Sequence, residues 1–412
     1  MMIIKRGFIV LVTGVLLFSV WTFSRAKEAT EFPQGTATPS EVCGECHKAI
    51  YNEFAYGFGS DLQYKAMTLK THQDKQLTLP AQVSAAATSH ALAGVDPFPI
   101  HARGLENQGQ SCNVCHFPEA FNLPGLENPE IPRVKPRPTA QEAGGMTCAS
   151  CHLTPDGKIR GPYQVDAPHP TVVEPKMKTS EMCAFCHSIG KRVEGKGTQT
   201  TLEWRDDFHK KGLGSQHCQD CHMPRTLRKS AEDSDGPVRA VARHLWTGGR
   251  SKQRLSSALS LVAVQREKEK PDFEFHIINI GAGHSVPTGS NRRGMYLIAE
   301  VLNKSGKPVA AQEWFFAPWY GNRPDDKAFL EEDKKRPDAI AVIQADAQGP
   351  HENILLAGEE RILSWSPKLK AGDYKVQARL VYDLNRYNSR EYKDDQTEIN
   401  RASISIKVGT AE

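Results

Sequence analysis

Ten cysteines and five histidines of the sequence form five copies of one pattern, C-x-x-C-H, and no other cysteine is present. The copies are Cys43-Gly-Glu-Cys46-His47, Cys112-Asn-Val-Cys115-His116, Cys148-Ala-Ser-Cys151-His152, Cys183-Ala-Phe-Cys186-His187 and Cys218-Gln-Asp-Cys221-His222. Two thiols three positions apart can each add to a vinyl group on one porphyrin edge, and the adjacent histidine then lies under the ring as the proximal iron ligand. Zinc ribbons and disulfides are the alternatives, but a zinc site places no demand on the residue after the second cysteine. The pattern therefore predicts five covalently attached c-type haems.

The motifs are closely spaced, since residues 43–222 contain all five of them. So short a segment cannot bury five porphyrins separately, and we expect the macrocycles to stack on one another and form the core. Over residues 27–229 we therefore predict a pentahaem domain with short helices around each motif, long irregular connections and almost no sheet. Electron tunnelling falls steeply with distance, so this density favours a chain of redox centres.

The remaining histidines supply candidates for the distal ligand, on the iron face opposite the motif histidine. Full bis-histidine coordination needs five of them. We select two in the long interval between the first two motifs, one that lies between two prolines, one after the last motif and one in a glycine-rich segment. They are His90, His101, His169, His244 and His284. The others lie in polar, loop or tightly tethered positions and are weaker candidates. They are His72, His209, His217, His276 and His351.

The amino terminus has the pattern of an export signal. Lys5 and Arg6 precede an apolar run over residues 7–23, and Ser24-Arg25-Ala26 offers small residues for a cleavage site. We interpret residues 1–26 as a signal peptide, with an uncleaved membrane anchor as the alternative because the run is long. Haem attachment of this type occurs outside the cytoplasm, so we expect a periplasmic or extracytoplasmic protein, associated with the membrane if the segment is retained.

The charge balance bears on partners. The net charge is +4, and the three basic residues of segment 1–26 account for most of it. A chain so near neutrality gives no support to nucleic-acid binding. We expect redox proteins as partners, either a quinol-oxidising donor or a terminal reductase or other acceptor.

Beyond a polar run at residues 230–237 the apolar residues alternate with a period of two. The alternating stretches lie at 259–265, 273–277, 374–382 and 404–408 and are separated by glycine, proline and asparagine turns. We interpret residues 230–257 as a linker carrying His244, and residues 258–412 as an antiparallel, Ig-like β-sandwich. Tyr374 at the start of a strand is typical of a tyrosine corner, and Trp314-Phe-Phe316 is expected in the strand core. The predicted fold is thus multidomain, with a multihaem cytochrome c domain followed by a sandwich.

These motifs resemble the multihaem c-type cytochromes. The first four motifs, with Lys65-Ala66-Met67, resemble the tetrahaem cytochrome c that accepts electrons from hydroxylamine oxidoreductase. The fifth, read as far as Pro224, is similar to a motif of pentahaem nitrite reductases and their relatives. Residues 281–289 resemble the start of a β-sandwich tail found in bacterial multihaem cytochromes. The resemblance implies a pentahaem cytochrome with an added C-terminal domain.

The departures from these relatives bear on activity. Where the tetrahaem relative has a histidine ligand before the Lys-Ala-Met segment, this chain has Ser60 to Gln63. A C-x-x-C-K motif and an identifiable cross-linked tyrosine, expected of the two enzyme families, are missing. We therefore predict an electron carrier with mostly bis-histidine haems. The alternative is a haem enzyme with an open iron site acting on a small nitrogen or sulfur compound, unless Met67 fills that position. A third interpretation is a subunit docked in a larger complex through its sandwich.

Overall fold

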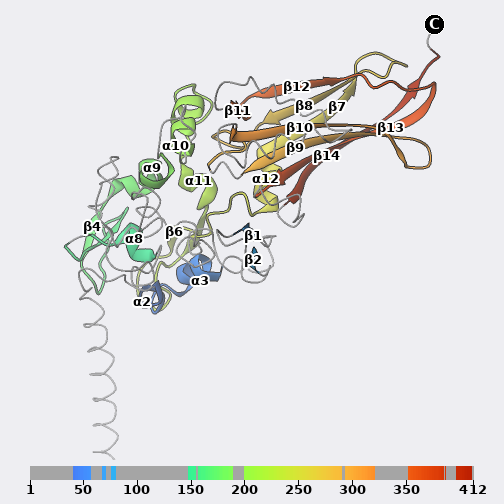
Figure 1. Ribbon diagram of the computed structural model, residues 1–412. Coiled ribbons are helices and arrows are strands. Elements are labelled where there is room, and N and C mark those ends of the chain that lie inside the picture. The colour runs from blue at the N-terminus through green and yellow to red at the C-terminus, as the bar shows by residue number, and fades with distance from the viewer. Residues whose placement is uncertain are drawn as a thin grey trace, which may run out of the picture.

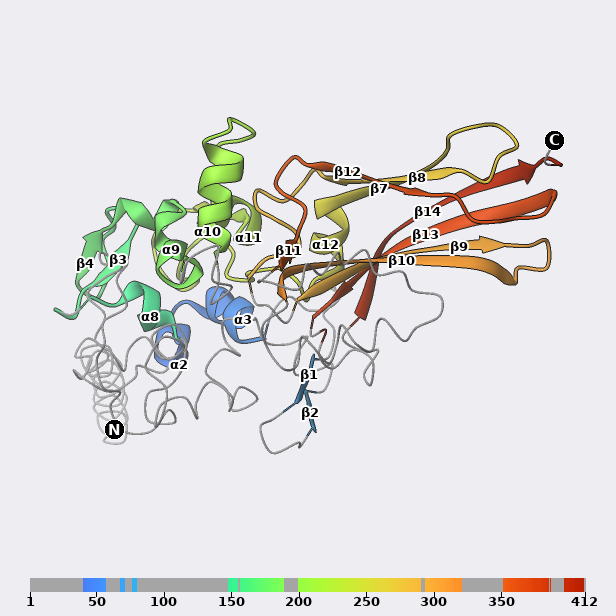
Figure 2. The same ribbon diagram turned by 45° about the horizontal axis from the view of Figure 1, so that its top comes forward.

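The computed structural model describes residues 40–56, 67–70, 76–79, 147–154, 156–188, 199–289, 293–320, 351–384, 386 and 396–410. Figures 1 and 2 show a part built from short helices and small strand pairs, and beside it a part built from long strands. Helix α12 (Lys252–Ala258) lies where the two parts meet. The chain is therefore multidomain, with its antiparallel sheets in the C-terminal region.

The described motifs lie on or beside short helices, as expected. These helices are α2 (Ser40–Gly44), α3 (Lys48–Tyr56), α8 (Cys148–His152), α9 (Glu181–His187) and α11 (Cys218–His222). In two of them the residue just before the second cysteine caps the helix start. Ser150 Oγ accepts from the backbone N–H of Thr147 at 2.9 Å, and Asp220 Oδ2 accepts from that of His217 at 2.9 Å. The variable positions of the motif thus help to begin the helix that presents it.

The prediction of almost no sheet around the motifs is wrong in three places, where short strand pairs occur. They are β1 (Met67–Lys70) with β2 (Gln76–Leu79), β3 (Ile159–Gly161) with β4 (Thr171–Val173), and β5 (Arg225–Arg228) with β6 (Arg239–Ala242). Three or four residues are too few to display a period of two in the sequence. Between α9 and α11 lie α10 (Thr200–Glu203) and the π-helix η3 (Trp204–His209), and η2 (Pro175–Lys178) precedes α9.

The polar run at 230–237 is part of a β-hairpin, so the expectation of a linker there is wrong. It joins β5 to antiparallel β6, and its side chains face the start of α3. The carboxylate of Glu232 accepts from the backbone N–H groups of Lys48 at 2.9 Å and Ala49 at 3.0 Å. Composition suggests solvated chain, but these oxygens instead satisfy the unpaired donors of a helix N-terminus.

The C-terminal part contains two antiparallel sheets. One has the strand order β11-β10-β9-β13-β14 and the other β12-β8-β7. The strands are β7 (Leu259–Gln265), β8 (Phe273–Asn279), β9 (Gly294–Leu302), β10 (Pro308–Tyr320), β11 (His351–Asn353), β12 (Glu360–Trp365), β13 (Gly372–Asp383) and β14 (Gln396–Val408). Buried side chains of both sheets, together with Leu255 and Ala258 of α12, form one apolar core.

Two expectations for this part are confirmed. Trp314 and Phe316 belong to the main core, and Phe315 is buried in a smaller cluster on the other face of β10. The hydroxyl of Tyr374 donates to the carbonyl of Lys370 at 3.0 Å, which is the hydrogen bond of a tyrosine corner.

Candidate functional site

Three motif histidines each lie opposite a histidine from a distant segment. The ring centroids of His47 and His169 are 6.4 Å apart. The rings of His152 and His244 are 6.1 Å apart, and those of His222 and His284 are also 6.1 Å apart with planes only 13° from parallel. The structure thus brings three of the five predicted distal histidines against three of the predicted proximal ones.

The spacing of these three pairs fits a metal held between two imidazoles. A ligating imidazole nitrogen lies about 2 Å from a first-row metal, and its ring centre lies roughly 1.2 Å further along the same line. Two rings on opposite sides of one metal therefore have centroids about 6.4 Å apart, close to the observed separations. The donor set and its spacing accordingly fit an iron with two axial histidines.

In five of the six paired histidines, the ring nitrogen Nδ1 contacts a backbone carbonyl. The distances from Nδ1 to the carbonyl oxygen are 2.7 Å for His47 and Ser230, 2.9 Å for His152 and Arg160, 2.6 Å for His222 and Thr247, 3.1 Å for His244 and Ala242, and 2.8 Å for His284 and Ser285. A carbonyl only accepts, so Nδ1 must carry the proton and donate. The lone pair is then on Nε2, the tautomer needed for iron ligation through that atom.

Burial favours the neutral form of five of the six imidazoles. It lowers the pKa of His222 to about 4 and the pKa of His244 to about 3, with positive charge on a neighbouring histidine acting in the same direction. Burial is also the largest cause that lowers the pKa values of His152, His169 and His284. At neutral pH these rings are free of a competing proton on the ligating nitrogen.

The attachment cysteines meet in two equivalent pairs. Within each pair the side chains lie in hydrogen-bonding contact, Cys43 with Cys148 and Cys183 with Cys218. In each pair, a serine three residues before the first cysteine hydrogen-bonds to the backbone of the other cysteine and so holds the two motifs together. Ser40 Oγ accepts from the backbone N–H of Cys148 at 3.2 Å, and Ser180 Oγ accepts from that of Cys218 at 3.2 Å.

The sequence carries the signal for this repeat, since Ser-Glu-x-Cys precedes both the first and the fourth motif. Sequence reasoning missed it because the partner motif of each serine lies far along the chain. Burial is the largest cause that lowers the pKa of His187 in the fourth motif, and an electrostatic contribution from His284 acts in the same direction.

Glycines frame the segment that carries His284. A Cβ on Gly281 would lie 2.1 Å from the carbonyl oxygen of Ser257 in α12, so only glycine allows this contact. Gly289 has a φ of +82°, and glycine accepts this left-handed conformation without strain. The two glycines thus let the chain pass close to α12 before His284 and turn sharply after it.

Other predicted residues lie outside the described parts of the chain. They are Cys112, Cys115, His116, His90 and His101. Two weaker candidates have other partners: His209 stacks on Trp204 at 5.1 Å, and Nδ1 of His217 accepts from the backbone N–H of Ser180 at 3.2 Å. Within the described residues, no three or more His, Cys, Asp or Glu side chains cluster in a way that could hold a metal ion. Over the same residues, no helix combines the length and the apolar character needed to cross a bilayer. Segment 1–26 is not among them.

Comparisons with known proteins agree with these features. A family model described as outer membrane cytochrome MtrC/MtrF-like, domains II/IV, matches residues 25–200. The crystal structure of a penta-heme cytochrome c552 from Thermochromatium tepidum is similar with a TM-score of 0.55 and 17% identity, over 90% of this chain and 99% of that one. At this identity the likeness concerns the fold.

The other solved structures resemble only a minor part of the chain. The C-terminal domain of wzt has a TM-score of 0.19 and 13% identity, covering 34% of this chain and 60% of that one. A glycosyl hydrolase family 2 member from Bacteroides cellulosilyticus has a TM-score of 0.16 and 14% identity, covering 36% and 14%. Scores this low support no argument. No curated protein matches the sequence. The C-x-x-C-H motifs and the family model over residues 25–200 support a multihaem c-type cytochrome, and the penta-heme structure shares its fold.

Proposed function

We propose that this protein is an exported electron carrier with five covalently bound c-type haems, most or all of them ligated by two histidines. The observation that carries the proposal is the set of three histidine pairs at 6.1–6.4 Å, in which Nδ1 of five of the six rings contacts a backbone carbonyl. We assign His47 and His169, His152 and His244, and His222 and His284 as the axial ligands of three irons. The other two haems are assigned to the second and fourth motifs.

Two imidazoles per iron favour electron transfer over catalysis. A bound haem would supply one-electron chemistry at its iron, and two paired histidines would hold that iron from both sides and leave no position for a substrate. Two neutral nitrogen donors also favour the oxidised iron relative to a histidine and methionine pair, which lowers the reduction potential. The buried rings are held by backbone carbonyls, so they keep their orientation when the oxidation state changes.

The pairing of the motifs supports transfer between haems. Cys43 lies beside Cys148, and Cys183 lies beside Cys218, so two attachment points meet in each pair. Closely attached porphyrins shorten the distance that an electron must tunnel.

The domain organisation follows from the same residues. We assign residues 27–229, extended by hairpin β5–β6 and the segment through His244, to the haem-binding part. We assign residues 258–412 to the sandwich, which we class as Ig-like because of its tyrosine corner. The sandwich supplies His284 and so contributes to a haem site.

Export and redox partners complete the proposal. The signal-like segment 1–26 and the attachment chemistry support a location outside the cytoplasm, and the matching family model describes outer-membrane cytochromes. We propose that the donor is a quinol-oxidising protein and that the acceptor is a terminal reductase or another redox protein.

Electron paramagnetic resonance of the oxidised holoprotein, combined with a redox titration, tests this function. We expect low-spin signals that account for all of the iron, low reduction potentials, and no rapid binding of cyanide or nitric oxide to the iron. A substantial high-spin fraction that binds these ligands would instead favour an enzyme with an open iron site.

A further inference from the structure

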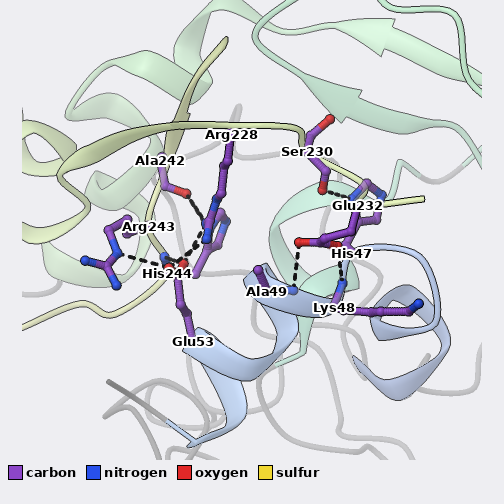
Figure 3. A network of polar contacts seen from close by, with 10 residues as sticks. All are labelled: His47, Lys48, Ala49, Glu53, Arg228, Ser230, Glu232, Ala242, Arg243 and His244. Atoms are coloured by element: carbon purple, nitrogen blue, oxygen red, sulfur yellow. Dashed lines mark hydrogen bonds and ion pairs between the residues drawn. The ribbon is translucent and has the colours of Figure 1, made fainter. Parts of the chain in front are cut away.

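A buried glutamate on α3 contacts the segment that carries a distal histidine. Glu53 is 6% exposed and lies two turns after the first motif. Its Oε1 accepts from Arg228 Nη1 at 2.8 Å and from Arg243 Nε at 3.0 Å. Its Oε2 accepts from Arg228 Nη2 at 2.7 Å and from the backbone N–H of His244 at 3.0 Å. Figure 3 shows the four donors converging on this carboxylate.

The network fixes the main chain at His244. A buried carboxylate is costly unless every oxygen has partners, and here both oxygens are satisfied by charged or backbone donors. Hydrogen bonds from its arginines hold the pKa of Glu53 below its ordinary value, against the opposing effect of burial, which is the largest single influence. The ring of His244 is held separately through Nδ1 and the Ala242 carbonyl. Glu53 therefore links helix α3, which follows the first motif, to the segment in which His244 faces the third motif.

A second buried glutamate has the same relation to His284. Glu203, at the end of α10, is 3% exposed. Its Oε2 accepts from the backbone N–H of Ser285 at 3.1 Å and from Thr288 Oγ1 at 2.7 Å. Ser285 follows His284 directly, and its carbonyl contacts the ring of His284. The carboxylate thus holds a loop of the sandwich against the haem-binding part.

On the basis of the bis-histidine ligation proposed above, we propose that Glu53 and Glu203 are positioning residues that hold the distal histidines of two haems in place. Each carboxylate comes from a helix in the haem-binding part and accepts a backbone N–H at, or directly after, the histidine. Each of these histidines lies far along the chain from the motif that it faces. A fixed main chain reduces the conformational entropy lost when the imidazole binds.

The contacts described at the two sites set the variants. Both oxygens of Glu53 accept hydrogen bonds. Glu53→Gln replaces one of them with an NH₂ group, which is itself a donor and would face the donors of Arg228, Arg243 or His244. Glu203→Gln keeps an oxygen for Ser285 and Thr288, whereas Glu203→Ala removes it. Glu398→Gln is the matched control, since Glu398 forms a solvent-accessible ion pair with Arg401 on the sandwich, away from any histidine pair.

The variants are compared as full-length holoproteins by haem content, paramagnetic resonance and redox titration. We expect all of them to retain their covalent haems. Glu53→Gln should alter the signal and raise the potential of the same haem that His244→Ala alters, and Glu203→Ala should do so for the haem altered by His284→Ala. Glu203→Gln should restore most of the wild-type signal, and Glu398→Gln should not differ from it.

A double-mutant cycle separates positioning from general destabilisation. Glu53→Gln added to His244→Ala should change the haem signals no further than His244→Ala alone, because the two act on one ligand. Wild-type signals and potentials in folded Glu53→Gln and Glu203→Ala proteins would overturn the assignment while leaving bis-histidine ligation intact. A wild-type protein without bis-histidine signals would instead overturn the proposed function. If Glu53→Gln does not accumulate, the contrast between Glu203→Ala and Glu203→Gln decides.

Discussion

Replacing His284 by alanine removes one imidazole from the pair whose rings are 6.1 Å apart and nearly parallel. The five motifs predict five irons, so one fifth of the iron should change from low-spin to high-spin while all five haems stay attached. The altered haem should also have a higher potential. For a one-electron couple, each tenfold preference of the lost ligand for oxidised over reduced iron corresponds to about 59 mV.

The assay is quantitative paramagnetic resonance of the oxidised protein, with spin counting, followed by a redox titration. Added imidazole should reverse the change, because the alanine leaves a gap of the shape of the missing ring. His276→Ala is the matched control, since Nδ1 of His276 lies 2.7 Å from a carboxylate oxygen of Glu360 and its ring faces no motif histidine in the described structure. An unchanged spectrum and titration in folded His284→Ala protein would refute the ligand assignment.

Three further predictions can be checked on the same protein. The denatured, fully matured chain should have the mass of the polypeptide plus five haems, and a stable lower number would contradict the assignment of five motifs. Ser180→Ala should lower the free energy of unfolding of the holoprotein by about 1–3 kcal/mol in urea titrations, since Ser180 is buried and its loss leaves the half-buried N–H of Cys218 without its acceptor; a loss below about 0.5 kcal/mol would count against it. Hydrogen bonds from Arg205 and a nearby lysine hold the pKa of Asp206 far below its ordinary value. Asp206→Asn should therefore be less stable than wild type at pH 7, and the difference should shrink as the pH falls below about 4. A difference that is constant over this range would exclude the charge as its source.

The local sequence was enough to identify the motifs, their helices and the alternation of the sandwich. It also pointed to His169, His244 and His284, whose proline, tryptophan and glycine neighbours present a ring in a defined direction. Their role as ligands stays a prediction, but the structure places each opposite a motif histidine. These features depend on residues that are close in the chain, so they can be recognised from the sequence without knowledge of the tertiary structure.

The contacts that join distant segments could not be predicted in this way. Nothing local indicates that His169, just ahead of the fourth motif, faces the first one. The run at 230–237 has the composition of a linker, yet Glu232 caps α3 because hairpin β5–β6 brings it there. Glu53 and Glu203 likewise look like ordinary helix-surface residues, and only tertiary packing makes them buried acceptors.

The order in which the paired histidines occur along the chain constrains how the protein matures. Each motif can receive its haem as soon as it emerges during export, because both cysteines and the proximal histidine are contiguous. The histidines opposite the first, third and fifth motifs all come later, the last of them from the sandwich. A nascent chain with every haem attached would therefore still contain exchangeable axial positions until its C-terminal strands had folded. With the ligation proposed above, folding of the sandwich would supply the last of these histidines, and the spin state of the haems would then report on maturation.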